Sequence, residues 1–214
     1  MAGAAPSKRT KTTPPRRRQP EEVRARILDA AMACFADRGF DGTSVQRIAR
    51  QAQASVPLLI YHFQSKENLW KATVEEAVRR FETRLDDLSQ DAGLSATEKL
   101  RQIIVALVQV NRERPEFHRL MSLESHRHTE RLEWLCARFV RRHFATIVAI
   151  IAAAQAEGSV RQVAPERLSH ALVAMAAIPG QGAEFSLVTG HDLFSDDETQ
   201  KTLDTINRLV FVDL

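Results

Sequence analysis

The sequence predicts an all-α protein with a small N-terminal unit of three helices, a connector helix and a larger C-terminal helical bundle, about nine helices in total. Two observations predict this class. Apolar residues recur at three- and four-residue spacing from Glu21 to Val210, with almost no strand-like alternation. Ser, Thr or Pro stands at the start of most of these stretches, as is typical of helix N-termini. A hydrophobic content of 44% in 214 residues is ample for a packed core.

The first twenty residues are expected to form a disordered basic arm. They contain six basic side chains and no acid, so this segment carries +6 and leaves −3 for the rest of a chain whose total is +3. Four prolines interrupt the segment, and it lacks the apolar stretch of a secretory signal. Two interpretations stay open: a solvated end, or an arm whose Arg16, Arg17 and Arg18 bind nucleic acid.

Three helices are predicted between residues 21 and 65. The first ends at Gly39. Thr43 is the predicted N-cap of a second helix over residues 44–51, because Gln46 follows three residues later and completes a capping box. Both side chains would then satisfy free amides at the start of that helix.

A three-residue break, Gln53-Ala54-Ser55, separates the second helix from the third. Ser55 is a plausible new N-cap, and Pro57 lies in the first turn, where its missing N–H is tolerated. The third helix is expected to end near Phe63. Two short helices joined by a short turn and packed on a longer helix are typical of a helix-turn-helix, whose second helix reads DNA.

Residues 21–70 resemble the DNA-binding domain of the TetR family (TetR/AcrR-type) of one-component bacterial transcriptional regulators. The resemblance implies a helix-turn-helix domain over 21–65, a connector helix over 66–90, and a ligand-binding and dimerisation bundle over 91–214. The function it implies is a DNA-binding regulator, a repressor that a small molecule releases from double-stranded operator DNA. The matching residues are Ile27, Ala30, Ala31, Phe35, Gly39, Gly42, Thr43, Ile48, Ala49, Ala52, Ser55, Leu59, Tyr61, His62, Phe63, Ser65, Lys66, Glu67 and Leu69.

The candidate DNA contacts lie in the second and third helices. Leu59 and Phe63 are four residues apart and must face the small core, which turns the residues around them partly outward. The resemblance implies phosphate contacts from His62 and Lys66 and base contacts from residues 55–58. Packing against the following helix is the alternative for Tyr61 and His62. Besides the arm arginines, the candidates are Thr43, Gln46, Arg47, Ser55, Val56, Pro57, Leu58, Tyr61, His62 and Lys66.

Four residues depart from the family pattern. Gln53 replaces a turn glycine, so the turn needs left-handed backbone geometry at some cost, or a slightly different shape. Pro57 replaces a common glycine and Arg47 a usual acid. Ile60 replaces a frequent tyrosine and cannot donate a hydrogen bond to phosphate, so we assign that contact to Tyr61.

In the second half of the chain, the sequence predicts helices over residues 97–114, 115–126, 130–156, 165–188 and 195–210. The helix over 165–188 is expected to be interrupted at Pro179-Gly180. The resemblance implies that the last two pair with their twofold mates in a homodimer. The same apolar residues suit the protomer's own core, because periodicity does not identify the partner helix. The predicted interface is Leu168, Leu172, Met175, Phe185, Leu203, Ile206 and Val210.

The resemblance also implies a pocket for a small-molecule effector between the middle helices. An apolar lining favours a lipophilic effector, although each lining residue also suits the core or the surface. His118, Arg119, His126 and His128 lie nearby as polar groups. The predicted lining is Trp70, Val74, Ile103, Leu107, Phe117, Met121, Glu124, Trp134 and Phe139.

Other classes are disfavoured. The chain contains no GxSxG, HExxH, P-loop or GxGxxG pattern, so we predict no enzyme and no cofactor. His126 and His128 are two residues apart and point to different helix faces, so no metal site is predicted. A helical module that binds protein and a ligand-independent activator remain as alternatives.

The location expected from the sequence is the cytoplasm. The longest nearly apolar run, residues 144–154, is shorter than the roughly 20 residues that cross a membrane, so no membrane partner is expected. Cys34 and Cys136 lie far apart without a CxxC spacing and are expected to be buried thiols in a reducing compartment.

Overall fold

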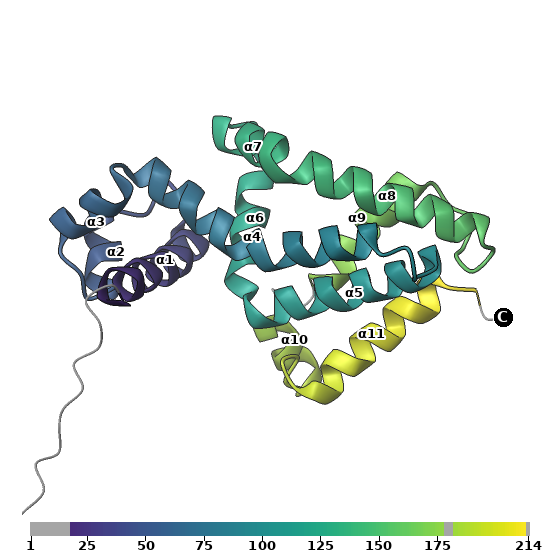
Figure 1. Ribbon diagram of the computed structural model, residues 1–214. Coiled ribbons are helices and arrows are strands. Elements are labelled where there is room, and N and C mark those ends of the chain that lie inside the picture. Colours follow the sequence, from purple (N-terminus) through teal and green to yellow (C-terminus); the bar gives the residue numbers. More distant parts are fainter. Residues whose placement is uncertain (1–17, 178–181, 213–214) are drawn as a thin grey trace, which may run out of the picture.

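The computed structural model describes residues 18–177 and 182–212, and these residues are all-helical, as predicted. Figure 1 shows two parts: a head of three helices, and a larger bundle that a long fourth helix joins to it. Within the described residues the one β-bridge pairs Val160 with Phe211. The head is α1 (Arg18–Arg38), α2 (Val45–Gln51) and α3 (Val56–Phe63).

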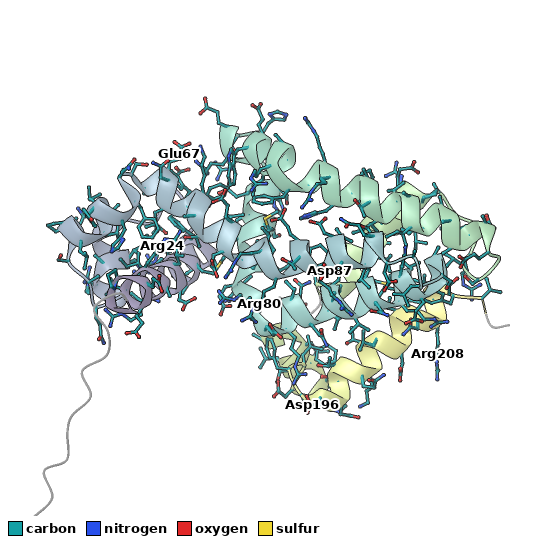
Figure 2. All side chains as sticks on the ribbon, in the orientation of Figure 1. Arg24, Glu67, Arg80, Asp87, Asp196 and Arg208 are labelled. Atoms are coloured by element: carbon teal, nitrogen blue, oxygen red, sulfur yellow. The ribbon has the colours of Figure 1, made fainter. Side chains whose placement is uncertain are left out.

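The connecting helix is α4 (Lys66–Gln90), and the bundle follows it. Charged side chains cover the outer faces of both parts, among them Arg24, Glu67 and Asp196 (Figure 2). The bundle consists of α5 (Ala96–Glu113), α6 (Pro115–Ser125), α7 (Glu130–Leu135), a π-helical turn (Cys136–Val140), α8 (Arg141–Ala156), α9 (Pro165–Ala176), α10 (Gly182–Thr189) and α11 (Asp196–Val210).

The first helix begins earlier than predicted. Residues 18–20 are already helical, so Arg18 belongs to α1 and not to a disordered arm. Arg16 and Arg17 lie outside the described residues.

Serine N-caps set the starts of several helices. The backbone N–H of Leu58 donates to Ser55 Oγ (3.3 Å), that of Asn68 to Ser65 Oγ (3.0 Å), and that of Glu198 to Ser195 Oγ (3.3 Å). The predicted cap at Ser55 is confirmed. Each of the three caps satisfies a backbone amide that the helix itself leaves free.

The predicted N-cap at Thr43 is wrong by one residue. Ser44 caps α2, and its Oγ accepts from the Arg47 N–H at 3.2 Å. Thr43 is only 2% exposed, and its hydroxyl lies within hydrogen-bonding distance of the Cys34 and Gly39 carbonyls at 3.0 and 2.8 Å. Its side chain therefore ties the end of α1 to the start of α2 and is not available to DNA.

Left-handed backbone geometry occurs where the missing turn glycine predicted it. Gln53 has φ of 50°, and the Ala54 N–H closes the turn on the Ala49 carbonyl at 2.9 Å. A second residue of this kind, Gln64 with φ of 65°, ends α3 and was not predicted.

The predicted helix over residues 130–156 is present but not uniform. Its middle forms the π-helical turn from Cys136 to Val140, between α7 and α8. Such turns carry one extra residue per turn and occur frequently at functional sites. A 3.6-residue apolar period does not reveal them.

Two hydrophobic cores hold the fold. The first joins the head to α4, α6 and the α7 region, so residues such as Phe35 and Leu120 share one cluster. The second fills the bundle. The head thus rests directly on α6 and α7 as well as on α4.

Most of the predicted dimer interface is wrong because its residues belong to the second core. Leu168, Leu172, Ile206 and Val210 are buried within the protomer. Met175 and Leu203 are half-buried and pack against the same cluster. Phe185 on α10 is half-exposed. The alternative, a core role, holds for the four buried residues.

Gly42 is the position where the head tolerates no side chain. A Cβ there would lie 2.5 Å from the carbonyl oxygen of Arg38. We expect Gly42→Ala to lower the free energy of unfolding by about 2 kcal/mol, because the backbone must shift to relieve the overlap. Gly93→Ala is the control: its Cβ would be 3.2 Å from a flexible Asp91 side chain. Equal urea midpoints for the two variants would contradict the prediction.

Candidate functional site

The predicted DNA-contacting surface of the head is the outer face of α3. Leu59 and Phe63 are buried on its inner face, whereas Tyr61 is 80% exposed and Ile60 is also exposed. The His62 ring is half-buried and contacts Tyr61 edge to face, with centroids 5.4 Å apart. The geometry therefore leaves Tyr61 as the most accessible aromatic group of the head.

The other candidates on α2 and α3 differ in how far they reach solvent. Gln46, Ser55 and Pro57 are exposed, and Leu58 is half-buried. Val56 is half-buried and packs against the first core, so it faces inward more than expected. The exposed candidates are thus Gln46, Ser55, Pro57 and Tyr61.

Arg47 is turned toward α1. Its guanidinium lies 3.7 Å from the carboxylate of Asp37, and its Nε is buried without a hydrogen-bond partner within residues 18–177 and 182–212. A phosphate contact would require this side chain to move away from Asp37.

Lys66 contacts an aromatic ring at the junction of head and bundle. Its ammonium lies 4.2 Å from the ring centroid of Phe40, and burial lowers the pKa of this ammonium. The guanidinium of Arg131, from α7, lies 4.1 Å from the centroid of the same ring. Phe40 follows α1, so α4 and α7 both hold the α1–α2 connection.

The prediction that Glu124 lines the ligand pocket is wrong, because Glu124 belongs to this junction. Its side chain is 5% exposed, and Arg131 Nε donates to both carboxylate oxygens at 3.2 Å. The ion pair links α6 to α7 beside Phe40.

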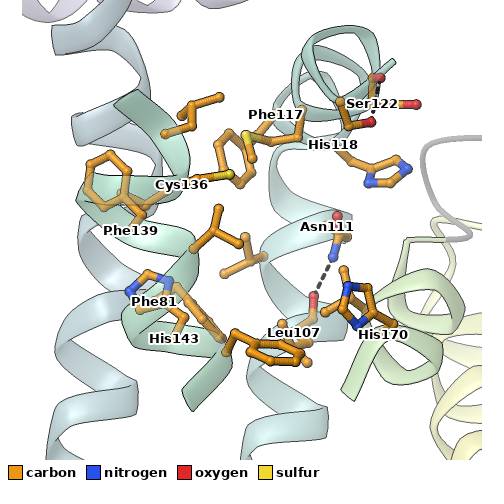
Figure 3. A pocket seen from close by; sticks show the side chains of 18 of the residues that line it. Phe81, Leu107, Asn111, Phe117, His118, Ser122, Cys136, Phe139, His143 and His170 are labelled. Atoms are coloured by element: carbon orange, nitrogen blue, oxygen red, sulfur yellow. Dashed lines mark hydrogen bonds between the residues drawn. The ribbon is translucent and has the colours of Figure 1, made fainter. Parts of the chain in front are cut away.

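A cavity of about 580 Å³ lies within the bundle, between α4 and α9 (Figure 3). Five predicted residues line it: Val74, Leu107, Phe117, Met121 and Phe139.

Three more predicted lining residues, besides Glu124, lie elsewhere. Trp70 is fully buried in the first core, where its ring meets that of Trp134 at 5.8 Å between centroids. Ile103 is buried in the second core. Trp70 and Ile103 each lie one turn before a residue that does line the cavity, Val74 and Leu107, so the cavity begins along the same helix face and periodicity alone does not reveal where.

The cavity contains polar groups that sequence reasoning missed. They are Asn111 on α5, His143 on α8, and Ser169 and His170 on α9. Asn111, His143 and Ser169 lie on the apolar stripes of their helices, and a polar residue on such a stripe is the signal that could have found them, whereas His170 is exposed. Of the predicted polar groups near the pocket, His118 lines it, whereas Arg119 pairs with Glu116 and His128 with Glu133.

Burial keeps two of the cavity imidazoles uncharged. It lowers the pKa of His118 and of His143 below the ordinary histidine value, so both are neutral at neutral pH. His143 has Glu82 beside it, with Nε2 and Oε1 3.4 Å apart, and this carboxylate opposes the effect of burial without overcoming it.

Both parts of the chain match known protein families. Residues 27–73 match the family described as bacterial regulatory proteins, tetR family, and residues 97–210 match the tetracyclin repressor-like C-terminal domain. The chain belongs to the TetR family.

Two curated relatives share part of the sequence. The chain is 33% identical to the HTH-type transcriptional regulator RutR of Escherichia coli K12 over 115 residues, which is 53% of each protein. It is 27% identical to the HTH-type transcriptional repressor NicS of Pseudomonas putida over 116 residues, 54% of each. The chain thus spans about half the length of these curated relatives.

Two solved structures share the fold. A tetR-family regulatory protein from Rhodococcus RHA1 superposes with a TM-score of 0.70 at 19% identity, covering 89% of this chain and 98% of the other. HlyIIR, a hemolysin II transcriptional regulator, superposes with a TM-score of 0.63 at 20% sequence identity, covering 88% of this chain and 99% of the other.

Two further properties concern the described part of this TetR-family chain. None of its helices combines the length and the hydropathy required to cross a bilayer. No three of its His, Cys, Asp and Glu side chains come together as a potential metal site.

Proposed function

We propose that the chain is a homodimeric DNA-binding transcriptional repressor that a small molecule, bound in the cavity, releases from its operator. The observation that carries the proposal is the course of α4. This helix begins at Lys66, directly after the reading helix, and lines the cavity with Val74, Val78 and Phe81. A ligand therefore touches the helix that carries the head.

Release requires two states that the ligand distinguishes. A ligand that fits the cavity better when α4 is displaced favours the displaced state by its difference in affinity, and DNA favours the other. The junction at Phe40 transmits the same displacement, because Arg131 on α7 contacts Phe40 and α7 continues into the cavity-lining π-helical turn.

A dimer is proposed because α10 and α11 expose apolar residues. Leu187 is 89% exposed, Val188 is 79% exposed, and Leu209 on α11 is also exposed. Large apolar side chains exposed on these two helices support an interaction site. Two heads on one dimer would read half-sites about 34–36 Å apart.

Tyr61→Ala tests DNA binding by the head. We expect the variant to bind DNA flanking its own gene about tenfold more weakly, since the hydrogen bond that the Tyr61 hydroxyl would donate to a phosphate is lost. Its melting temperature should not change, because Tyr61 is largely exposed. The measurement is an electrophoretic mobility shift at several salt concentrations.

Val163→Ala is the matched control, an exposed apolar residue between α8 and α9. It should bind as the unmodified protein does. A complete lack of sequence-dependent, salt-sensitive shift by the unmodified protein would refute the regulator and favour a protein-binding module. Operator binding that no cavity ligand changes would favour a ligand-independent activator.

A further inference from the structure

The cavity contains no charged side chain. Its lining includes aromatic, aliphatic, hydroxyl, amide, thiol and imidazole groups, but no Asp, Glu, Lys or Arg among the described residues. An ionised ligand group placed there would lose its hydration without gaining a counter-charge, which is costly. The imidazoles of His118 and His143 do not replace that counter-charge, because burial holds both neutral.

One polar atom is oriented into this space. Asn111 is buried, and its Nδ2 donates to the Leu107 carbonyl at 2.8 Å. Since a carbonyl only accepts, this bond fixes which end of the amide is nitrogen. Oδ1 is directed away from Leu107, on the side of His118 (Figure 3), and accepts no hydrogen bond from the described residues.

Three of the polar side chains lie on one side of the cavity, whereas His143 lies beside Phe81 on the other. Figure 3 shows Asn111, His118 and His170 together on one side of the cavity, with Phe81 and Phe139 across from them. His170 Nδ1 lies 3.0 Å from the Glu166 carbonyl and donates to it, because a carbonyl oxygen only accepts. The acceptor that this side offers is therefore Asn111 Oδ1.

We infer that the cavity binds an uncharged amphiphile with an apolar chain or ring system and a hydroxyl or N–H group that donates to Asn111 Oδ1. The volume of about 580 Å³ is in the usual range for small-molecule sites, about 300–1,000 Å³. The inference rests on the proposed function for its regulatory meaning, since it names the class of effector that the repressor would respond to.

Three probes with the same chain and different head groups test the class: 1-decanol, decanoate and decylammonium. Binding is measured by isothermal titration calorimetry at neutral pH without DNA. We expect 1-decanol to bind at least about tenfold more tightly than either ion, because only the ions bring an unpaired charge into the cavity. Equal or tighter binding of decanoate or decylammonium, or no binding of any probe, would overturn the inference.

Asn111→Leu tests the proposed acceptor. The substitution keeps the approximate volume and removes Oδ1, so the affinity for 1-decanol should fall about fivefold. Ser125→Ala is the control: Ser125 also lines the cavity, but its hydroxyl already donates to the Ser122 carbonyl at 2.9 Å. Equal affinities of the two variants would refute the role of Asn111.

The two proposals fail separately. The probe series uses the unmodified protein and does not depend on the folding of any variant. Because the titrations contain no DNA, a protein that binds 1-decanol selectively but no operator would refute the proposed function and leave the ligand class intact. A protein that binds its operator but fails the probe series would refute the ligand class and leave the DNA-binding function intact.

Discussion

Replacing both Leu187 and Val188 with glutamate is expected to convert the protein into a monomer and to weaken operator binding by about a hundredfold or more. Both side chains are almost fully exposed on α10, so the substitutions disturb little within the protomer. In a dimer they would place four carboxylates in an apolar contact, where burial of unpaired charge is costly.

The loss of operator affinity follows from the loss of the second head. Once one head of a dimer is bound, the other acts at a high effective concentration, and linking two sites in this way raises overall affinity by about 10²–10⁴. A monomer keeps the contacts of one half-site only. Mobility shifts on the full operator and on a single half-site should therefore give similar, weak affinities for the variant.

Sedimentation velocity checks the oligomeric state. Leu123→Glu is the control, because Leu123 is also an exposed apolar residue but lies on α6. It should leave both the mass and the operator affinity unchanged. If the α10 variant still sediments as a dimer, another face forms the interface.

Arg131→Leu is expected to give the largest loss of stability, about 3 kcal/mol of unfolding free energy. Glu124 is almost completely buried, and Arg131 donates to both of its oxygens. Removing the guanidinium leaves a buried carboxylate without its counter-charge and also removes the contact with Phe40.

A second substitution separates the charge from the packing. Adding Glu124→Gln to Arg131→Leu removes the orphaned charge and should restore a large part of the loss, whereas the contribution of the Phe40 contact should remain missing. Urea unfolding of the two variants measures the difference.

Arg119→Leu is the control for a solvent-exposed pair. Arg119 lies 3.7 Å from Glu116 on the same helix, with both side chains substantially exposed, so its loss should cost no more than about 0.5 kcal/mol. Equal losses for Arg119→Leu and Arg131→Leu would contradict the importance of burial at Glu124.

Local features of this fold could be predicted because their causes are local. Ser55, Ser65 and Ser195 cap helices through a backbone amide three residues ahead, and the left-handed turn at Gln53 follows from the short break between two helices. The shift from Thr43 to Ser44 shows the limit: both residues can cap, and the packing of α1 against α2 decides between them.

The cavity could be predicted only in part. Trp70 and Val74 are one turn apart on the same apolar stripe of α4 and both belong to the first core, yet only Val74 also lines the cavity. The edge of the cavity falls between them. A sequence period identifies a buried face but not the neighbour that buries it.

The sequence by itself determined the helical class, most of the caps, the helix-turn-helix and the family, because these depend on spacing and on residue type over short distances. Only the tertiary structure decided that Leu172 and Ile206 fill the protomer's core while Leu187 and Val188 face outward, and that Asn111 directs an oxygen into an uncharged cavity. These outcomes depend on how the helices are rotated against one another, and each helix offers the same apolar residues to any neighbour that fits.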